Sequence, residues 1–314
     1  MAADDDRAVP NRATWPIAAA MLQFPNTLPD GSSTQDQPAE AWAQALGEVA
    51  DAGFDCVDPY DSWLRLADLS AARLQEFIEV LRTVGLRVPA VSVARRSVID
   101  PDDGEEYLAY SHRAVDAAAA VGAGVLNVGL FRALTPAQSE ALWFWTAQGP
   151  VDPDDDEEVW ALAVRRLREL GRHAAEVGLG LSLEMYEDTY LGTADSAVRL
   201  VTDIGEDNVG LNPDLGNLLR LHRPVERWDA MAAKVLPLAN FWHMKNYFRT
   251  EDATTGAIVT APAPLELGVM DYRRAIKMAV ASGFRGPITC EHYGGDGLSV
   301  SATNREYLRR VLPR

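Results

Sequence analysis

The chain has 314 residues, of which 47% are hydrophobic and 24% are charged, a composition that suits a soluble globular protein with a sizeable core. Its formal net charge of −17 argues against nucleic acid as a partner, because that affinity comes largely from Lys and Arg side chains that displace counterions from phosphates. No stretch approaches the roughly 18 to 20 apolar residues of a membrane span, and the first residues lack a secretory signal. We therefore expect a cytoplasmic protein that contacts no membrane.

Short apolar runs alternate with amphipathic stretches along the chain, which is the pattern of repeated βα units around a parallel sheet. Strands are predicted over residues 16–24, 54–59, 87–93, 124–131, 180–185, 209–214, 240–246 and 287–293. Helices are predicted over residues 38–52, 70–84, 105–121, 157–177, 194–204, 225–236, 271–281 and 302–311. Eight such units predict a single (β/α)8 TIM barrel over residues 14–314, preceded by a disordered tail of residues 1–13.

Two predicted connections are longer than such a barrel needs. The first, residues 133–156, contains the aromatic cluster Trp143-Phe144-Trp145, followed by an acidic run that favours the start of the next helix. It is either a hairpin that packs on top of the barrel or a lid in which Trp143 and Trp145 offer aromatic faces to a sugar. The second, residues 249–268, is rich in Thr, Ala and Pro and predicts a mobile loop over the same face.

Ionisable residues end four of the predicted strands, at the face where barrel enzymes build their active sites. Because side chains alternate along a strand, their apolar neighbours suit the helix layer and the ionisable residues face the barrel interior. The four residues are Glu184, Asp214, His243 and Glu291. Three inward carboxylates repel one another unless a cation neutralises them, so we expect all four residues to bind one divalent metal. This ligand set favours Mn²⁺, while Co²⁺, Fe²⁺, Mg²⁺ and Zn²⁺ remain open.

The same alternation turns Asn212 and Lys245 into the barrel. Lys245 either donates a hydrogen bond to a substrate oxygen on which negative charge develops or pairs with a carboxylate of the barrel. His292 points outward if its strand continues that far, and it either packs there or takes part in acid–base chemistry.

The strand-end segments resemble the successive motifs of the sugar phosphate isomerase/epimerase superfamily, the xylose-isomerase-like TIM barrels. The matching segments are Leu183-Glu184, Asn212-Pro213-Asp214-Leu215-Gly216-Asn217, His243-Met244-Lys245-Asn246 and Cys290-Glu291-His292-Tyr293-Gly294. In D-tagatose 3-epimerase-type enzymes, the residues that match Glu184, Asp214, His243 and Glu291 bind one Mn²⁺ or Co²⁺. The resemblance implies that the two glutamates also serve as acid and base, and that Arg249, six residues after His243, contacts the substrate.

The chain departs from those epimerases at two positions. Asn217 stands where they have a histidine, and Tyr190 stands where they have a second glutamate. Both family residues hold substrate hydroxyls, so the departures put simple ketohexose epimerisation in doubt and leave the metal site intact. The predicted catalytic residues are Glu184, Glu291 and Lys245. The predicted substrate-binding residues are Arg249, Asn212, Asn217, His292, Trp143 and Trp145.

The expected chemistry removes a proton next to a substrate carbonyl, since a divalent metal that holds the carbonyl stabilises the resulting enediolate. Return of the proton to the same carbon gives an epimerase, return to the neighbouring carbon gives an isomerase, and expulsion of a β-substituent gives a lyase. The last outcome is that of C-glycoside deglycosidases, whose larger subunit resembles this barrel, binds Mn²⁺ and acts on 3-oxo-glycosides with a small partner subunit. A non-catalytic sugar-binding barrel is an alternative of another class. A sugar or glycoside is the expected ligand, and the resemblance implies a homo-oligomer or a hetero-oligomer with a small subunit.

Overall fold

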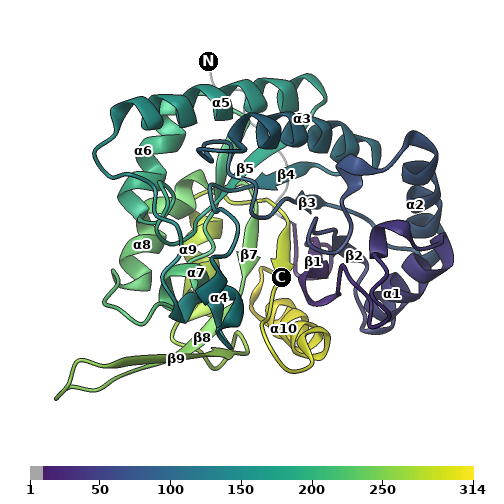
Figure 1. Ribbon diagram of the computed structural model, residues 1–314. Helices are drawn as coiled ribbons and strands as arrows, with labels where there is room; N and C mark the ends of the chain where they lie inside the picture. The colour runs from purple at the N-terminus through teal and green to yellow at the C-terminus, as the bar shows by residue number, and fades with distance from the viewer. Residues whose placement is uncertain (1–9) are drawn as a thin grey trace.

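Eight parallel strands form the centre of the structure, a computed structural model that describes residues 10–314 (Figure 1). The strands are β1 (Ile17–Ala20), β2 (Cys56–Asp58), β3 (Ala90–Ser92), β4 (Val125–Val128), β5 (Gly180–Glu184), β6 (Val209–Asn212), β7 (Trp242–Met244) and β10 (Ile288–Cys290). They pair in the orders β2-β1-β10-β7 and β3-β4-β5-β6. Isolated bridges between Tyr60 and Ser92 and between Leu211 and Ala239 join the two sheets. Each of the eight predicted runs contains one of these strands, and the predicted (β/α)8 barrel is confirmed.

Eight longer helices of the described part of the chain surround this barrel (Figure 1). They are α1 (Ala39–Asp51), α2 (Ala71–Val84), α3 (Gly104–Ala120), α5 (Glu157–Glu176), α6 (Ala194–Ile204), α8 (Trp228–Val235), α9 (Tyr272–Ala281) and α10 (Gly297–Val311). The shorter ones are α4 (Pro136–Glu140), α7 (Gly216–Leu219) and the 3-10 turns η1 (Met21–Gln23), η2 (Thr34–Asp36), η3 (Leu66–Asp68), η4 (Phe144–Thr146) and η5 (Leu236–Leu238). No helix within residues 10–314 is both long enough and apolar enough to cross a membrane.

Local signals in the sequence set the helix ends. The Asp156 carboxylate accepts the backbone N–H groups of Glu158 and Val159, which otherwise lack partners at the start of α5. Gly85 and Gly205 end α2 and α6 with φ angles of +83° and +66°. Residues other than glycine rarely adopt this left-handed backbone conformation. Both kinds of signal are local to the chain and are therefore visible before the fold is known.

The alternation of side chains separates an apolar layer from a polar barrel interior. Leu181 and Leu183 of β5 are fully buried in the core between strands and helices. On the opposite face of the strands, the Asn127 amide donates to Ser92 Oγ at 3.2 Å and to Glu184 Oε2 at 3.0 Å. Polar side chains from β3, β4 and β5 thus meet across the interior of the barrel, and the predicted inward direction of Glu184 is confirmed.

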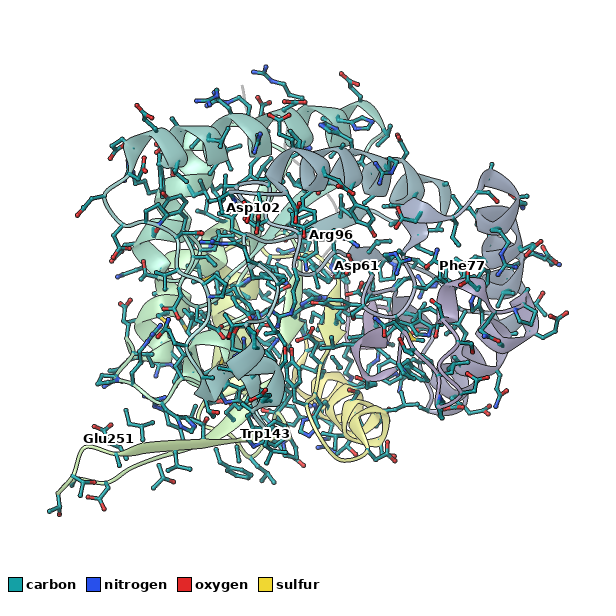
Figure 2. The ribbon with its side chains drawn as sticks, viewed as in Figure 1. Asp61, Phe77, Arg96, Asp102, Trp143 and Glu251 are labelled. Carbon is teal, nitrogen blue, oxygen red and sulfur yellow. The ribbon has the colours of Figure 1, made fainter. Side chains whose placement is uncertain are left out.

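The segment predicted as a mobile loop, residues 249–268, instead contains the end of one strand and the whole of its partner. β8 (Asn246–Glu251) and β9 (Ile258–Ala263) pair in antiparallel fashion, with Arg249 opposite Thr260. The hairpin extends away from the barrel, and Glu251 lies near its far part (Figures 1 and 2). The prediction was wrong because it gave weight to Thr, Ala and Pro as loop residues, whereas the aromatic residues of β8 and the β-branched residues of β9 favour pairing.

The predicted N-terminal tail overlaps the described part of the chain only at residues 10–13; residues 1–9 lie outside it. Asn11 Oδ1 accepts the backbone N–H of Ala13 at 2.9 Å and starts a turn. The Arg12 N–H donates to the Pro313 carbonyl at 2.6 Å, and Arg309 donates to the Arg12 carbonyl at 2.7 Å. Residues 10–13 are therefore held against the C-terminal end of the chain, and the boundary between tail and barrel stays a prediction.

Candidate active site

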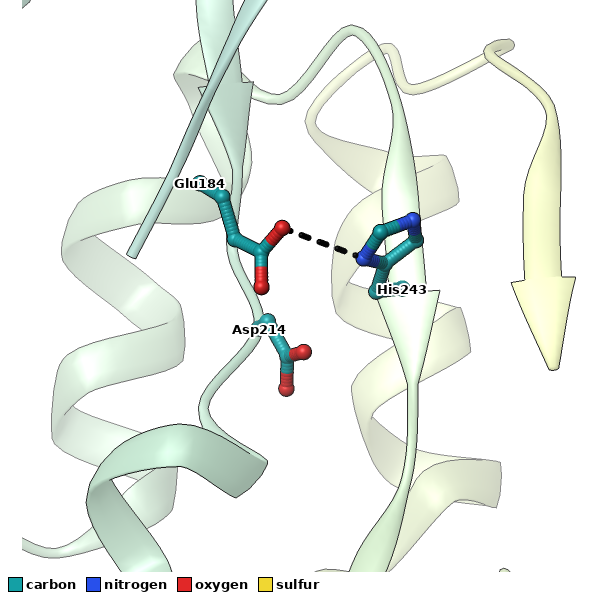
Figure 3. A group of neighbouring side chains, drawn as sticks. All are labelled: Glu184, Asp214 and His243. Atoms are coloured by element: carbon teal, nitrogen blue, oxygen red, sulfur yellow. Dashed lines mark ion pairs between the residues drawn. The ribbon is translucent and has the colours of Figure 1, made fainter. Parts of the chain in front are cut away.

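The C-terminal ends of β5, β6 and β7 bring three of the predicted metal ligands together. Glu184 ends β5, Asp214 follows β6 by two residues, and His243 lies in the middle of β7. One ligand atom of each residue lies within 4.8 Å of those of the other two, and all three side chains are buried and face one another (Figure 3). The fourth residue, Glu291, directly follows β10 and places Oε1 at 3.5 Å from His243 Nδ1. The four side chains therefore face one shared region.

Several buried polar atoms in this region have no hydrogen-bond partner within residues 10–314. They include His243 Nδ1, Asp214 Oδ1 and Glu291 Oε1. A buried polar atom without a partner costs roughly 1–3 kcal/mol of stability, and more when the group is charged. A divalent cation that accepts lone pairs from these atoms removes that cost. The donor set of oxygens with one imidazole nitrogen fits such an ion, with Glu184, Asp214, His243 and Glu291 as the groups that would hold it.

Asp58, at the end of β2, fixes the orientation of the His243 ring. Its Oδ2 lies 3.0 Å from His243 Nε2, and Ser92 Oγ lies 3.2 Å from the same nitrogen. On the other side of the ring, Nδ1 lies 3.3 Å from Glu184 Oε2. A metal-binding histidine commonly donates its distal N–H to a carboxylate, which leaves the other nitrogen free for the ion. Sequence reasoning missed Asp58, although an acid at the C-terminal end of a predicted strand was the signal that found the other residues.

Replacing Asp58 with asparagine is expected to weaken divalent-cation affinity by about 10- to 100-fold, because the amide no longer holds His243 in the tautomer that presents Nδ1 to the ion. Isothermal titration with Mg²⁺ and Mn²⁺ measures the change. Asp152→Asn is the matched control, since it removes a buried carboxylate that contacts Arg132 and the Tyr190 backbone instead. Equal affinities for wild type and Asp58→Asn would contradict this role.

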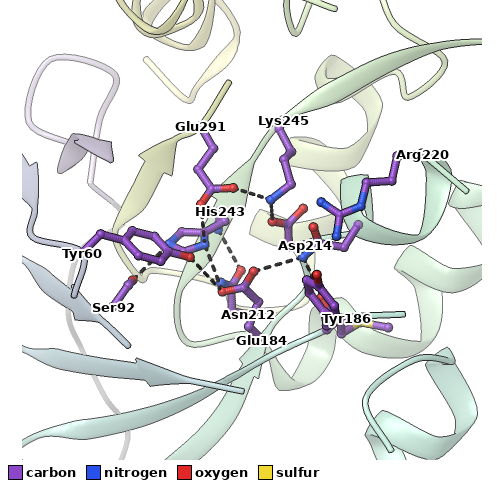
Figure 4. A network of polar contacts seen from close by, with 12 residues as sticks. Tyr60, Ser92, Glu184, Tyr186, Asn212, Asp214, Arg220, His243, Lys245 and Glu291 are labelled. Carbon is purple, nitrogen blue, oxygen red and sulfur yellow. Dashed lines mark hydrogen bonds and ion pairs between the residues drawn. The ribbon is translucent and has the colours of Figure 1, made fainter. Parts of the chain in front are cut away.

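Lys245 lies between two of the carboxylates. Its ammonium group donates to Asp214 Oδ2 and to Glu291 Oε2 (Figure 4). Burial alone lowers the pKa of this lysine, but the carboxylates of Asp214 and Glu291 raise it well above its usual value, so the group is charged. The structure thus contains the carboxylate pairing that the sequence left as one of two alternatives. A hydrogen bond to the substrate remains a prediction.

Two asparagines hold Glu184 in place. Asn217 Nδ2 donates to Glu184 Oε1 and Asn127 Nδ2 donates to Oε2, both at 3.0 Å. Burial opposes ionisation of Glu184, yet His243 and Lys245 lower its pKa to about 2. Burial raises the pKa of Asp214 to about 7 even though Lys245 opposes the shift. The carboxylates of Glu291 and Glu184 add to the rise at Asp214, so negative charge is unfavourable in this region and a bound cation would relieve it.

The remaining predicted substrate-binding residues have mixed positions. Asn212 is fully buried beneath the site, where Oδ1 accepts the His243 backbone N–H at 2.8 Å and Nδ2 donates to Asn127 Oδ1 at 3.3 Å. It positions β7. Its side chain is absent from the lining of the surface cleft that reaches Glu184, which is described below. His292 is half-buried, its side chain makes no hydrogen bond within residues 10–314, and burial lowers its pKa. Asn217 lines the cleft, and its Oδ1 has no hydrogen-bond partner among residues 10–314, so a substrate contact there remains a proposal.

Arg249 is held by backbone groups. Its Nη1 donates to the carbonyls of Leu219 and Leu221 at 3.0 and 2.6 Å, and its Nη2 donates to that of Arg223 at 2.6 Å. These bonds tie β8 to the last residue of α7 and to the segment that follows it. They give Arg249 a structural contact that the resemblance did not imply, and substrate binding by this residue remains a prediction.

The aromatic cluster of residues 143–145 packs on Tyr247 and Tyr293, beside the candidate site. Trp145 is buried with its ring centroid 5.5 Å from that of Tyr293, and Trp143 stacks on Trp145 at 5.0 Å. Beneath them the fully buried Arg220 donates to both oxygens of Glu187 at 2.8 Å, a pair that the sequence did not reveal. Packing on top of the barrel, one of the two interpretations of this segment, is thus observed. Contact between the tryptophans and a sugar remains a proposal.

A cleft of about 300 Å³ opens from Glu184 toward the surface. Its inner part is formed by Glu184, Asn217, Tyr60, Tyr186 and Tyr293. Tyr60 Oη lies 3.5 Å from Glu184 Oε2, and burial together with nearby carboxylates raises the pKa of this phenol well above its usual value. The tyrosine is therefore neutral and acts as a hydrogen-bond donor at neutral pH. The arrangement gives a small polar ligand access to a carboxylate, a phenol and the region that fits a cation.

Comparisons with known proteins agree with this geometry. A family model described as "Xylose isomerase-like TIM barrel" matches residues 46–311. A xylose isomerase-like TIM barrel protein from Mycobacterium smegmatis, solved in complex with magnesium, is 51% identical; the match covers 96% of this chain and 98% of that one, with a TM-score of 0.92. No curated protein matches the sequence.

Two more distant structures share the fold. D-psicose 3-epimerase from Clostridium cellulolyticum H10, solved with D-tagatose, is 14% identical over 95% of this chain and 100% of that chain, with a TM-score of 0.66. A 3-keto-D-glucoside 4-epimerase from E. coli is 16% identical over 95% of this chain and 100% of that chain, with a TM-score of 0.65. At these identities the likeness establishes the architecture alone.

Proposed function

The chain belongs to the xylose isomerase-like TIM barrel family, and from this premise we propose that it is a divalent-metal-dependent enzyme that moves a proton next to the carbonyl of a sugar-like substrate. The observation that carries the proposal is the convergence of Glu184, Asp214 and His243 around buried, unpartnered ligand atoms, with Glu291 beside them. The magnesium complex of the 51% identical relative supports a divalent cation. The preference for Mn²⁺ expected from the ligand types remains a prediction.

Each residue has a distinct part in the proposed reaction. A bound divalent ion would polarise the substrate carbonyl and stabilise the negative charge that develops on its oxygen. Glu184 lines the cleft and takes the proton from the neighbouring carbon, while Glu291, which contacts the same nitrogen of His243 as Glu184 does, returns one. The Lys245 ammonium donates to a substrate oxygen as that oxygen gains charge, and the neutral Tyr60 phenol donates from the cleft wall.

The alternative outcomes share the removal of this proton and differ in the second step of the reaction. Sugar epimerases with the same fold favour return of the proton to carbon. A lyase on 3-oxo-glycosides would use the same carboxylates and replace proton return by expulsion of a β-substituent. A 3-keto-D-glucoside 4-epimerase from E. coli has the same fold, which supports this alternative. A non-catalytic sugar-binding barrel is disfavoured because the carboxylates and His243 form a complete ligand set.

Hydrogen exchange tests this proposal directly. Metal-loaded protein is incubated in D₂O with keto-sugars and 3-oxo-glycosides, and NMR follows exchange at the carbon next to the carbonyl. Exchange with an altered stereocentre indicates an epimerase, a shifted carbonyl indicates an isomerase, and release of the aglycone indicates a lyase. Glu184→Gln is expected to lower the exchange rate by about 10²- to 10⁴-fold, the usual contribution of a general base. Metal-loaded protein that exchanges no substrate proton across the panel would support the sugar-binding alternative.

A further inference from the structure

Three arginines line the wall of the cleft that leads to Glu184. They are Arg65, Arg95 and Arg96. Two of them have carboxylate partners: Arg65 Nε lies 2.9 Å from Asp68 Oδ2, and Arg96 Nε lies 3.0 Å from Asp61 Oδ2. Figure 2 shows Arg96 and Asp61 close to each other. The charges of these two arginines are therefore neutralised within the protein.

Arg95 has no carboxylate partner within residues 10–314. Its Nη1 donates to the Arg132 carbonyl at 3.1 Å, and its Nη2 donates to the Tyr186 hydroxyl at 3.2 Å. The guanidinium group also lies over the ring of Phe144, 4.9 Å from its centroid. A guanidinium group has five N–H donors, and two are used here, which leaves three for a ligand. Arg95 is thus a cation held beside the cleft without a counter-charge.

The backbone at Arg95 adopts a conformation that L-residues rarely take. Its φ angle is +56°, and Arg95 and Asp188 are the two non-glycine residues with positive φ within residues 10–314. A residue in such a conformation costs free energy and persists only where the surrounding structure holds it in place. Such residues concentrate at sites that bind ligands. Here the backbone turn follows β3 by three residues and directs the side chain toward Tyr186 and the cleft. The position of the guanidinium group is therefore set by the fold.

The negative charge of the whole chain strengthens the case that the unpaired Arg95 cation binds a ligand. A protein with a formal net charge of −17 repels small anions in general, so an anionic ligand needs a cation placed in its binding site. A planar guanidinium group matches the paired oxygens of a carboxylate or a phosphate better than an ammonium group does. Arg95 and Glu184 line the same cleft, and its volume of about 300 Å³ suits a ligand the size of a monosaccharide.

We propose that Arg95 binds an anionic group, a carboxylate or a phosphate, at the end of the sugar-like substrate away from the reacting carbonyl. The inference rests on the proposed function for the orientation of the substrate, with its carbonyl toward Glu184. It makes the substrate a sugar acid or a sugar phosphate rather than a neutral sugar. Tyr186, which lines the cleft and accepts the Arg95 hydrogen bond, orients the guanidinium group.

Equilibrium binding tests this inference without requiring turnover. Titration calorimetry compares D-fructose with D-fructose 6-phosphate and D-glucose with D-glucuronate, so that each pair differs in one anionic group. Wild type is expected to bind the anionic member of at least one pair about 10- to 100-fold more tightly, as hydrogen bonds to a charged group provide. The phosphate pair and the carboxylate pair distinguish the two sources of the anion. Repeating the titrations after EDTA treatment separates binding at Arg95 from binding of the anion to a metal.

Variants of the arginines supply the decisive comparison. Arg95→Asn is expected to abolish the preference for the anion while tolerating the positive φ angle, which asparagine adopts more readily than most residues. Arg95→Lys keeps the charge without the planar fork and is expected to lose part of the preference. Arg65→Gln removes the same charge from a salt-bridged arginine of the same cleft and should leave the preference unchanged.

The proposal is overturned if wild type binds both members of each pair equally, or if Arg65→Gln weakens anion binding as much as Arg95→Asn. Turnover of neutral sugars alone would leave the proposed function standing and reject this inference.

Discussion

Asp214→Asn is expected to reduce the affinity for Mg²⁺ and Mn²⁺ by more than about 100-fold. Loss of a residue that only hydrogen-bonds a metal ligand costs about 10- to 100-fold, and loss of a ligand itself should cost more. Asp214 is fully buried, its Oδ1 has no partner within residues 10–314, and its Oδ2 bonds only Lys245. Asparagine keeps the size of the side chain and removes the charge that attracts the ion. Titration calorimetry and the metal content of purified protein measure the loss.

Ser182→Ala serves as the control for Asp214→Asn. Ser182 lies in β5 two residues before Glu184, and its buried hydroxyl has no hydrogen-bond partner within residues 10–314. Removing that hydroxyl leaves no donor or acceptor stranded, so metal affinity and stability should stay near those of wild type. Stoichiometric metal in Asp214→Asn, at wild-type affinity, would show that the ion binds elsewhere and would remove the basis of the proposed function.

Arg220→Met is expected to lower the free energy of unfolding by about 3–5 kcal/mol, the usual cost of breaking a buried ion pair from one side. Arg220 is fully buried and donates to both oxygens of Glu187, which is itself 6% exposed. The guanidinium group also lies 4.7 Å from the centroid of Phe144 and 5.3 Å from that of Trp145. Its loss therefore leaves a buried carboxylate alone and also loosens the aromatic segment. Urea denaturation near neutral pH measures the effect.

The double variant Arg220→Met/Glu187→Met separates the ion pair from the packing. If the unpaired Glu187 charge causes most of the loss, the double variant should regain a large part of the stability that the single variant lost. If both variants are equally unstable, contacts of Arg220 with the aromatic rings carry the effect instead. A single variant as stable as wild type would mean that water reaches Glu187, contrary to its burial.

The part of the candidate site that lies at strand ends could be predicted, because strand geometry alone places those residues. Alternation along a strand is a local property, and in a barrel all strands end at the same face. Those two facts placed Glu184, Asp214, His243 and Glu291 near a common point before any contact was known. The same reasoning applied to residues 54–59 would have found Asp58, the acid that ends β2 and contacts His243.

Other features needed the tertiary structure because they depend on distant partners. Whether Lys245 faces a substrate or a carboxylate depends on how closely β6, β7 and β10 approach one another, and the structure places Asp214 and Glu291 on either side of it. Arg220, which follows α7, and Glu187, which follows β5, were overlooked because a single charged residue in a connecting segment carries no sign of burial. The β8–β9 hairpin was missed because a strand pair is stabilised by contacts between its two strands, which propensities of either strand alone do not reveal.

The sequence by itself determined the eight βα units, most of the helix ends and the face of each strand-end residue, because periodicity, capping and alternation act within a few residues. The start of α10 was missed, since this helix begins at Gly297 and not at residue 302. Tertiary structure alone decided which of these residues bond one another, as with Asp58 and His243, which are 185 positions apart. It also decided that Arg65 and Arg96 pair with carboxylates while Arg95 pairs with none in the described part of the chain. Contacts of that kind depend on strand register and barrel closure, which bring together side chains that no local rule relates.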